Sequence, residues 1–406
     1  MITVIQPGTF TTVQDLRRVG FQSAGVPECG AVDKFSMRCA NLLVGNSESE
    51  PVLELTLFGP QIAFDNPAIV AVTGANLSPK LDGASVENWT SFSVPAGGIL
   101  SFGGPVAGAR SYLSFAGGIR SSSVAEVMGS YSTYVPGGFG GFGGRPLKAG
   151  DELEIGETNL GEFKQRKFSS PPHFSEDALL RVLLGPQNHL FTDDSIQLMS
   201  NSDYQVSVDS DRMGIRLEGA PLTHHNSPDV VSDGTAFGTI QVPGSGLPII
   251  LSADRGTTGG YPKIATVISA DHSKLGQLLP GNTVRFSVVS REMALKALRE
   301  QERILDSLRD VPTVSSVVKV SGEIIDAVDE AGQTVPLNDV GYRFNASVRH
   351  GEHVENVEIK IEDYEEHRIC VVSVEKTQPK NWVWVSLKKF NKDGPEDGIF
   401  FMRSGP

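Results

Sequence analysis

Short apolar runs divided by turn-forming residues are the feature of this chain that most restricts its fold. The sequence has 44 glycines and 24 prolines among 406 residues, and glycine at about 11% exceeds the roughly 7% of an average protein. Each turn signal ends a strand, so the pattern predicts many short strands and few long helices. The predicted fold class is therefore mainly β.

The strand pattern divides the chain into two β-rich units and a tail. Residues 1–165 and 178–312 are predicted to form the two units, and 313–406 an accessory antiparallel β module of unknown role. Apolar and polar residues alternate in the tail, which is typical of antiparallel strands. The predicted strands are 2–5, 68–73, 112–115, 152–155, 179–184, 283–289, 355–361, 368–374 and 382–387.

Three helices are predicted between these strands. Asp33 is expected to cap a helix that ends at Gly45, and Asp271 to cap a short helix over 272–278. Residues 291–309 carry apolar side chains at helical spacing. We expect this third helix to pack on the second unit.

Composition excludes several classes of function. The formal net charge of -13 repels phosphate backbones and anionic membranes, so neither nucleic-acid nor membrane binding is expected. Three cysteines without a CxxC pair argue for a reducing compartment and against a zinc site. The N-terminus lacks signal-peptide features, and no apolar run is long enough to span a membrane. The predicted location is cytoplasmic.

Familiar cofactor and nucleophile motifs are missing or out of context. Residues 138–143 match GxGxxG, but Arg145 and Pro146 follow where a dinucleotide site needs a helix, so a flexible loop is predicted. The chain has no Walker phosphate loop and no GxSxG elbow. His224 and His225 leave metal binding open, as a less favoured alternative to surface or hydrogen-bonding roles. No cofactor or metal is predicted to be bound by this chain.

The stretch DRGTTGGYPKIATV at 254–267 gathers the functional groups that point to a polar site. We predict catalytic roles for Tyr261 and Lys263, and substrate contacts from Asp254, Thr258, Gly259 and Gly260. The two glycines are free to take positive φ, which lets the backbone approach another group closely.

Four polar residues elsewhere complete the predicted site. Arg212 is predicted to be catalytic, because a guanidinium presents a fixed fork of donors, and Arg216, Gln241 and Asp15 to contact substrate. Each has a plainer alternative. The two arginines could form ordinary ion pairs, Gln241 could satisfy buried backbone groups, and Asp15 could belong to a turn.

Many of these segments, in this order, resemble one family. The segments are GTFTTVQDLRRVGFQSAGVPECGAVD (8–33), ANLLVGN (40–46), LELTLFGPQIAF (53–64), TGANLSPKLDG (73–83), GSYSTY (129–134), SDRMGIRLEG (210–219), GTIQVPGSGLPI (238–249) and TTGGYPKIATV (257–267). Together they look like the biotin-dependent carboxyltransferase A/B family over roughly residues 1–290. Arg17, Tyr131 and Leu247 depart from the family pattern, and the tail matches nothing in it.

The resemblance implies a fold, partners and an activity. It implies two β-rich, barrel-like subdomains, the second cyclophilin-like, with a substrate cleft between them. The function expected first is one subunit of an ATP-dependent 5-oxoprolinase complex, which converts 5-oxoproline to glutamate and also contains a B-type companion and an A-type protein. ATP would act through those partners. The alternatives are carboxyl transfer from carboxybiotin to urea or a similar amide, the only case that involves biotin, and a non-enzymatic regulator that binds the companion.

Overall fold

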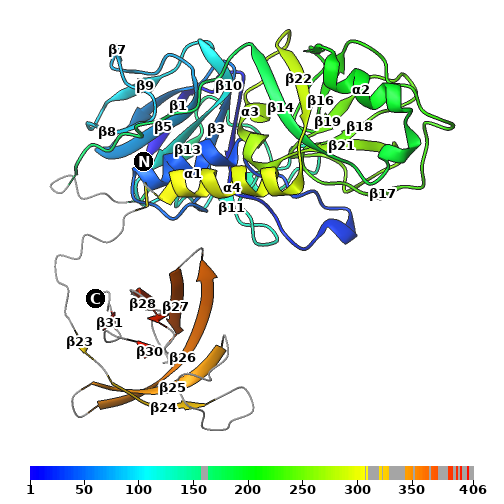
Figure 1. The fold of residues 1–406 in the computed structure, drawn as a ribbon. Helices are drawn as coiled ribbons and strands as arrows, with labels where there is room; N and C mark the ends of the chain where they lie inside the picture. Colours follow the sequence, from blue (N-terminus) through cyan, green and yellow to red (C-terminus); the bar gives the residue numbers. More distant parts are fainter. Residues whose placement is uncertain are drawn as a thin grey trace. The chain divides into compact units, whose positions relative to one another are not determined.

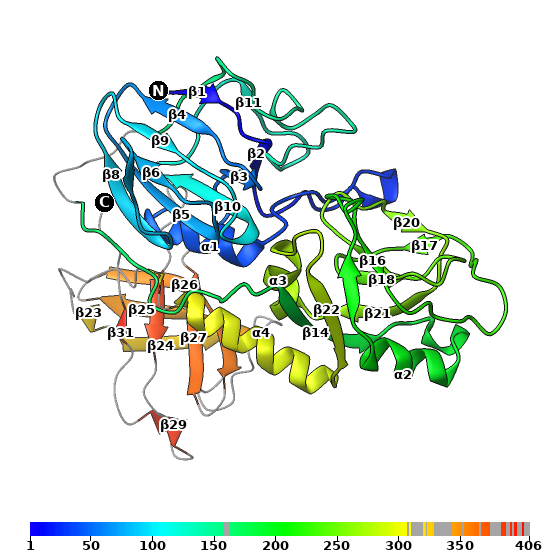
Figure 2. The same cartoon turned by 90° about the horizontal axis from the view of Figure 1, so that it is seen from above.

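The computed structural model divides the chain into two compact units, Met1–Asp310 and Val311–Pro406. It describes residues 1–156, 163–306 and 308–309, and in the second unit the backbone of the strands alone. The first unit consists of two β lobes, residues 1–156 and 177–288, joined by helices (Figures 1 and 2).

The first lobe is built from two facing sheets. One has the order β13-β1-β4-β9-β6-β7 and the other β2-β3-β10-β5-β8. Alternate side chains of both sheets, such as Val4, Ile62, Leu55 and Leu113, fill one buried core between them. The strands are β1 (Ile2–Gln6), β2 (Phe10–Gln14), β3 (Val52–Thr56), β4 (Gln61–Phe64), β5 (Ala68–Asn76), β6 (Lys80–Leu81), β7 (Ala84–Ser85), β8 (Thr90–Val94), β9 (Ile99–Ser101), β10 (Ala107–Phe115) and β13 (Glu152–Leu153), beside the small pair β11 (Val124–Ala125) and β12 (Gly141–Phe142).

The second lobe is a closed barrel, in agreement with the predicted fold class. Its order is β14-β21-β18-β19-β16-β15-β22, and β14 runs parallel to β22 while the other neighbours are antiparallel. Closure leaves no unpaired edge strand in the barrel itself. The strands are β14 (Asp177–Leu184), β15 (Tyr204–Val206), β16 (Gly214–Glu218), β18 (Thr239–Gln241), β19 (Ile249–Leu251), β21 (Lys263–Val267) and β22 (Thr283–Val288), with helix α2 (Asp193–Asn201) and the pair β17 (Asp233–Gly234) and β20 (Thr258–Gly259) outside the barrel.

Two of the predicted helix starts differ in how they are capped. Asp33 caps α1 (Lys34–Leu43), and its carboxylate accepts the backbone N–H of Ser36 at 3.0 Å, as predicted. Asp271 precedes α3 (His272–Gly276) but makes no capping bond. Its carboxylate instead accepts both Nε and Nη2 of Arg181, at 2.9 and 2.7 Å. The predicted cap is wrong, because a bidentate ion pair with an arginine is stronger than one hydrogen bond from a neutral backbone N–H.

Helix α4 (Arg291–Asp306) contacts both lobes, whereas the sequence predicts packing on the second alone. Its Gln301 donates to the Ala270 carbonyl in the second lobe at 3.3 Å. Leu305, in the last turn of the helix, and Leu308, just beyond it, are buried in a cluster that includes Phe35 of α1 in the first lobe. The predicted apolar stripe is present, but a stripe does not specify its partner.

A buried glutamine joins the two lobes behind these helices. The Gln277 Oε1 atom accepts the backbone N–H groups of Ala109 and Arg110 in β10, at 3.0 and 2.9 Å. Its Nε2 donates to Asp33 at 2.7 Å. Four contacts from one buried side chain, including a further bond to the Arg110 carbonyl, fix the angle between the lobes.

The second unit contains the antiparallel sheet β24-β25-β26-β27-β28. Its strands include the three predicted from sequence alternation. The bounds are β23 (Val320–Ser321), β24 (Glu323–Val328), β25 (Arg343–His350), β26 (His353–Tyr364), β27 (His367–Ser373), β28 (Val383–Ser386), β29 (Phe390–Asn391), β30 (Gly394–Pro395) and β31 (Phe400–Phe401). Among the described residues, no helix has the length and apolarity needed to cross a membrane.

Candidate functional site

Arg212 forms a buried clamp between the two lobes. Its Nε and Nη2 donate to the Asp254 carboxylate at 2.9 and 3.0 Å, and Nη2 also donates to the Gly30 carbonyl at 2.8 Å. Its Nη1 donates to Glu54 of β3. Burial alone would lower the pKa of Arg212. The Asp254 and Glu54 carboxylates raise it by more than burial lowers it, so the net shift is upward. The side chain is therefore a permanent cation that holds the lobes together.

Four of the predicted site residues meet at the rim of the barrel. Gln241 lies beside Gly259, and its Nε2 donates to the Tyr261 carbonyl at 3.2 Å. Next to them Lys263 is buried, with Nζ 3.4 Å from both the Gln187 Oε1 and an Asp233 carboxylate oxygen. The Tyr261 side chain is 41% exposed. We call Gln241, Gly259, Tyr261 and Lys263 the rim cluster.

The glycine pair does not adopt the positive φ that its sequence permits. Neither Gly259 nor Gly260 has a left-handed backbone. Gly259 is extended in the ladder of β17 and β20, where it pairs with Asp233. A Cβ on Gly259 would lie 2.5 Å from the Gln241 Nε2. Glycine is thus needed for close approach of a side chain and not for a turn.

The remaining predicted residues lie apart from the rim cluster or are engaged elsewhere. Asp15 accepts the Ser130 and Ser132 hydroxyls at 2.7 and 2.5 Å and the Tyr131 N–H at 2.6 Å, so its carboxylate orders that loop. Arg216 is exposed on β16, four residues beyond the buried Arg212. Thr258 is exposed on β20, next to the rim cluster.

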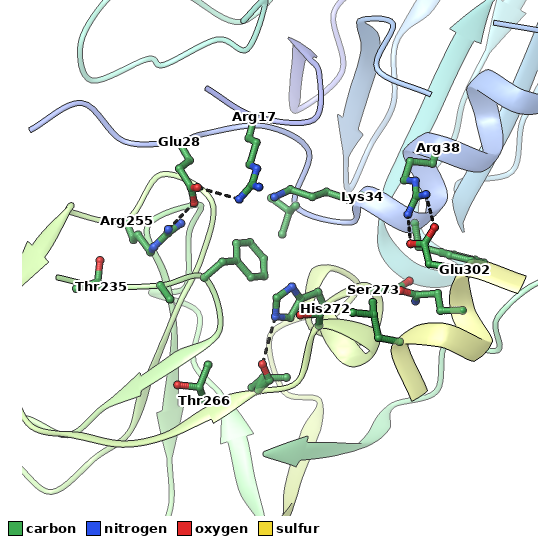
Figure 3. Close-up of a pocket in the computed structure, with 18 of the residues that line it drawn as sticks. Arg17, Glu28, Lys34, Arg38, Thr235, Arg255, Thr266, His272, Ser273 and Glu302 are labelled. Carbon is green, nitrogen blue, oxygen red and sulfur yellow. Dashed lines mark hydrogen bonds and ion pairs between the residues drawn. The ribbon is translucent and has the colours of Figure 1, made fainter. Parts of the chain in front are cut away.

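A cavity of about 530 Å³ lies between the lobes, beneath α4 (Figure 3). The first lobe contributes the segment from Arg17 to Val32 and the first turns of α1. The second lobe contributes Thr235 to Phe237, Arg255 and the region of His272. None of the ten predicted site residues lines this cavity. The loops that contribute Thr235 and Arg255 to the cavity continue into β17 and β20 beside the rim cluster. The two loops are joined there by the Thr235 hydroxyl, which donates to the Gly256 carbonyl at 2.5 Å.

An ion-pair network forms one side of the cavity. The Glu28 carboxylate accepts Arg255 Nη2 at 2.6 Å and Arg17 Nη1 at 3.0 Å. Burial alone would raise the pKa of Glu28. The two guanidinium groups lower it by more than burial raises it, so the net shift is downward. Glu28 is therefore ionised at neutral pH and bridges the lobes a second time.

Lys34 and His272 face the interior of the cavity as an ammonium, for which the described residues offer no acceptor, and a neutral imidazole (Figure 3). Burial and the nearby Arg17 charge lower the pKa of Lys34 to about 8. Burial and the Lys34 charge lower the pKa of His272 to about 4. His272 Nε2 lies 3.2 Å from the Val267 carbonyl, which only accepts, so the proton is on Nε2 and Nδ1 is an acceptor. Phe237 packs between the two, 5.6 Å from Lys34 Nζ and 4.5 Å from the imidazole centroid.

The residues of the cavity are missed by sequence reasoning, although some of them carry a signal. Arg255 lies inside the polar stretch 254–267, next to Asp254, and Arg17 is a departure from the family pattern. At Lys34 and His272 the sequence indicates only that a helix begins. The other two departures, Tyr131 and Leu247, do not line the cavity. In the described part of the chain no three His, Cys, Asp or Glu side chains are placed to hold a metal ion.

Comparison with known proteins identifies sequence relatives of the whole first unit. The family model described as carboxyltransferase domain, subdomain A and B, matches residues 24–288. The C-type subunit of the 5-oxoprolinase of Escherichia coli is 40% identical over 76% of this chain and 97% of its own length. Its namesake from Haemophilus influenzae is 35% identical over 77% and 98%. The urea amidolyase of Saccharomyces cerevisiae is 31% identical over 92% of this chain but only 21% of its own length.

Solved structures agree with the fold. The crystal structure of TTHA0988 is 34% identical, with a TM-score of 0.64, over 70% of this chain and 56% of that one. The Kluyveromyces lactis urea amidolyase is 26% identical, with a TM-score of 0.71, over 98% of this chain and 25% of that one. The chain thus spans only part of these longer solved chains. The family model ends at residue 288, before the tail, whereas the urea amidolyase similarities, which cover 92% and 98% of this chain, extend into it.

Proposed function

The chain belongs to the family of carboxyltransferase domains with subdomains A and B, and on this basis we propose that it is the C-type subunit of a 5-oxoprolinase. The reaction opens the lactam of 5-oxoproline to glutamate with hydrolysis of ATP. The observation that carries the proposal is the similarity to the C-type subunits of two 5-oxoprolinases over 97% and 98% of their own lengths. The urea amidolyase and urea carboxylase relatives are less similar, at 31% to 32% identity, and match over 18% to 30% of their lengths.

The rim cluster offers groups suited to an amide. A lactam presents one carbonyl acceptor and one N–H donor, and the side-chain amide of Gln241 donates and accepts at once. We assign Tyr261 and Lys263 to the developing charge on the lactam oxygen, which a phenol and an ammonium both stabilise. Arg212 receives a positioning role in place of the catalytic role predicted from sequence, because its donors are engaged in the clamp.

The ATP chemistry is assigned to partner proteins. The sequence contains no Walker phosphate loop. We propose that a B-type companion binds this chain directly and that an A-type protein completes the complex. The isolated chain should therefore neither bind ATP tightly nor hydrolyse it.

The proposal is tested by reconstitution with the two companion proteins. The assay measures glutamate formation and ATP hydrolysis with 5-oxoproline, and separately with urea. Tyr261→Phe should slow glutamate formation by roughly ten- to thousandfold, in the range seen when one oxyanion donor is removed. Tyr204→Phe is the matched control, since its hydroxyl donates to the Ala220 carbonyl at 3.2 Å, on the far side of the barrel from the rim cluster. Wild-type rates for Tyr261→Phe would remove the catalytic assignment, and turnover of urea but not 5-oxoproline would remove the function.

One observation favours a second candidate, carboxyl transfer to urea. The similarity to urea amidolyases covers 92% and 98% of this chain, whereas the similarity to the 5-oxoprolinase subunits covers 76% and 77%. This activity needs carboxybiotin from another chain or domain. Incubation with carboxybiotin and urea should give no carboxylated urea if the first proposal holds.

A further inference from the structure

The cavity between the lobes contains more positive charge than its own carboxylates balance. Four cationic side chains, Arg17, Lys34, Arg38 and Arg255, line it together with two carboxylates. Arg38 and Glu302 neutralise each other through two contacts of 2.6 Å. That leaves Glu28 as the one lining carboxylate for Arg17, Arg255 and Lys34. Two positive charges are uncompensated within the cavity.

Lys34 has no acceptor of its own within the described part of the chain. Its Nζ lies over the face of Phe237, and a cation over an aromatic ring recovers only part of the lost hydration energy. An unpaired ammonium beside two guanidinium groups is costly to keep, and the pKa of Lys34, lowered to about 8 first by burial and then by Arg17, agrees with that cost. A bound anion would remove it.

A second buried donor also lacks a partner. Arg255 is 6% exposed and lines the cavity, and among the described residues its Nε has no hydrogen-bond partner, as is also true of Arg18 Nη1 and Arg110 Nε, which do not line the cavity. Buried guanidinium nitrogens are ordinarily satisfied. The unpartnered donor is independent of the argument from Lys34.

We propose that this cavity is a binding site for a small oxyanion, a carboxylate or a phosphate, with Lys34 as its principal anchor. Arg17 and Arg255 supply further donors, and both are held in place by Glu28. His272 Nδ1 accepts an N–H or O–H from the same ligand, so the preferred ligand carries a donor beside its anionic group. Hydrogen phosphate and 5-oxoproline both have this chemistry.

The site is separate from the rim cluster; the binding of an oxyanion is independent of the proposed function, whereas the meaning given to each ligand below rests on it. No member of the rim cluster lines the cavity. A carboxylate ligand would make the cavity a substrate subsite. A phosphate would make it a receptor for the product of ATP hydrolysis on a partner.

Calorimetric titration of the full chain at neutral pH and constant ionic strength tests the proposal. Inorganic phosphate and 5-oxoproline are titrated separately. At least one should bind saturably at one site, and Lys34→Met should weaken that binding roughly ten- to hundredfold, the usual value of a charged hydrogen bond. Lys34→Arg should retain most of it. Lys80→Met, which removes an exposed lysine in the first lobe, should leave it unchanged.

The pH dependence of the affinity gives a second readout. Lys34 loses its charge above pH 8, so affinity should fall between pH 8 and 9 in the wild type and stay level in Lys34→Arg. The other charged groups near Lys34 are Arg17, Arg255, Glu28 and Asp15; guanidinium and carboxyl groups in general titrate far from pH 8–9. His272 is neutral throughout.

The outcomes separate the two sources of the anion. Binding of phosphate alone supports a phosphate site, and binding of 5-oxoproline alone supports a substrate subsite. Binding of neither probe, or equal affinity in Lys34→Met and the wild type, would overturn the proposal.

Discussion

The amide of Gln241 lies so close to Gly259 that a methyl group added at Gly259 would be 2.5 Å from its Nε2. Real Cβ contacts are not this short, and Gln241 is buried. The glutamine would have to move and would lose its bond to the Tyr261 carbonyl. One glycine therefore fixes the geometry of the rim cluster.

We predict that Gly259→Ala lowers glutamate formation by the reconstituted complex at least about tenfold, as expected when a catalytic group is misplaced by an ångström. Gly234→Ala is the matched control. Gly234 pairs with Thr258 in the same ladder, and its added methyl would meet no atom within 4 Å. Equal activities of the two variants would contradict the role of Gln241.

The clamp predicts a large loss of stability when Arg212 is replaced. Arg212→Met leaves the buried Glu54 and Asp254 carboxylates without their cation, which typically costs about 3–5 kcal/mol. Arg216→Met, on the same strand region but exposed, should change the unfolding free energy by less than about 0.5 kcal/mol. Chemical denaturation measures both. A small effect of Arg212→Met would show that the clamp does not hold the lobes together.

His272 predicts acid sensitivity. Its pKa falls from the ordinary 6.5 to about 4 on folding, so the unfolded chain binds the proton more readily. The neutral ring contributes stability that is present above pH 6.5 and is lost as the pH falls toward 4, by about 3 kcal/mol in total. His272→Gln should lose less stability than the wild type between about pH 7 and 4. Parallel pH profiles of the unfolding free energy would contradict this.

Helix α4 predicts where the chain tolerates truncation. A fragment of residues 1–312 keeps Leu305 and Leu308 in their cluster and should unfold close to the midpoint of the full chain. A fragment ending at 290 loses both, at about 1.5–3 kcal/mol each, and also the Arg38–Glu302 pair. Thermal unfolding of the two fragments and their affinity for the B-type companion test this. Insolubility of the longer fragment would mean that the tail covers part of the core.

Local signals in the sequence predict elements well. The Asp33 cap and the Gly45 stop mark α1 to within two residues, because capping depends on neighbours in the chain. Apolar runs between turn signals identify β1, β5, β10, β13, β14 and β22 in the lobes, and alternation identifies β26, β27 and β28 in the tail. The partner of a side chain is harder to predict from the sequence. Asp271, for example, does not cap its helix because it binds Arg181, which is 90 residues away.

The site could be predicted only in part, for the same physical reason. Gln241, Gly259, Tyr261 and Lys263 come together because β18, β20 and β21 are near one another in the sequence. The cavity requires Arg17 and Lys34 to meet Arg255 and His272, which come much later in the chain. Nothing in the local sequence indicates that meeting, and the low pKa of His272 arises from burial and from the charges of Lys34 and Arg255.

The account is tested most directly by adding this chain to a fixed mixture of the companion proteins, ATP and 5-oxoproline and measuring the rate of glutamate release. We predict no release without the chain, then a rate that rises with added chain, saturates at a fixed stoichiometry and is matched by ATP consumption. Full glutamate release by the companion proteins alone, or none at any amount of added chain, would contradict its assignment to a 5-oxoprolinase.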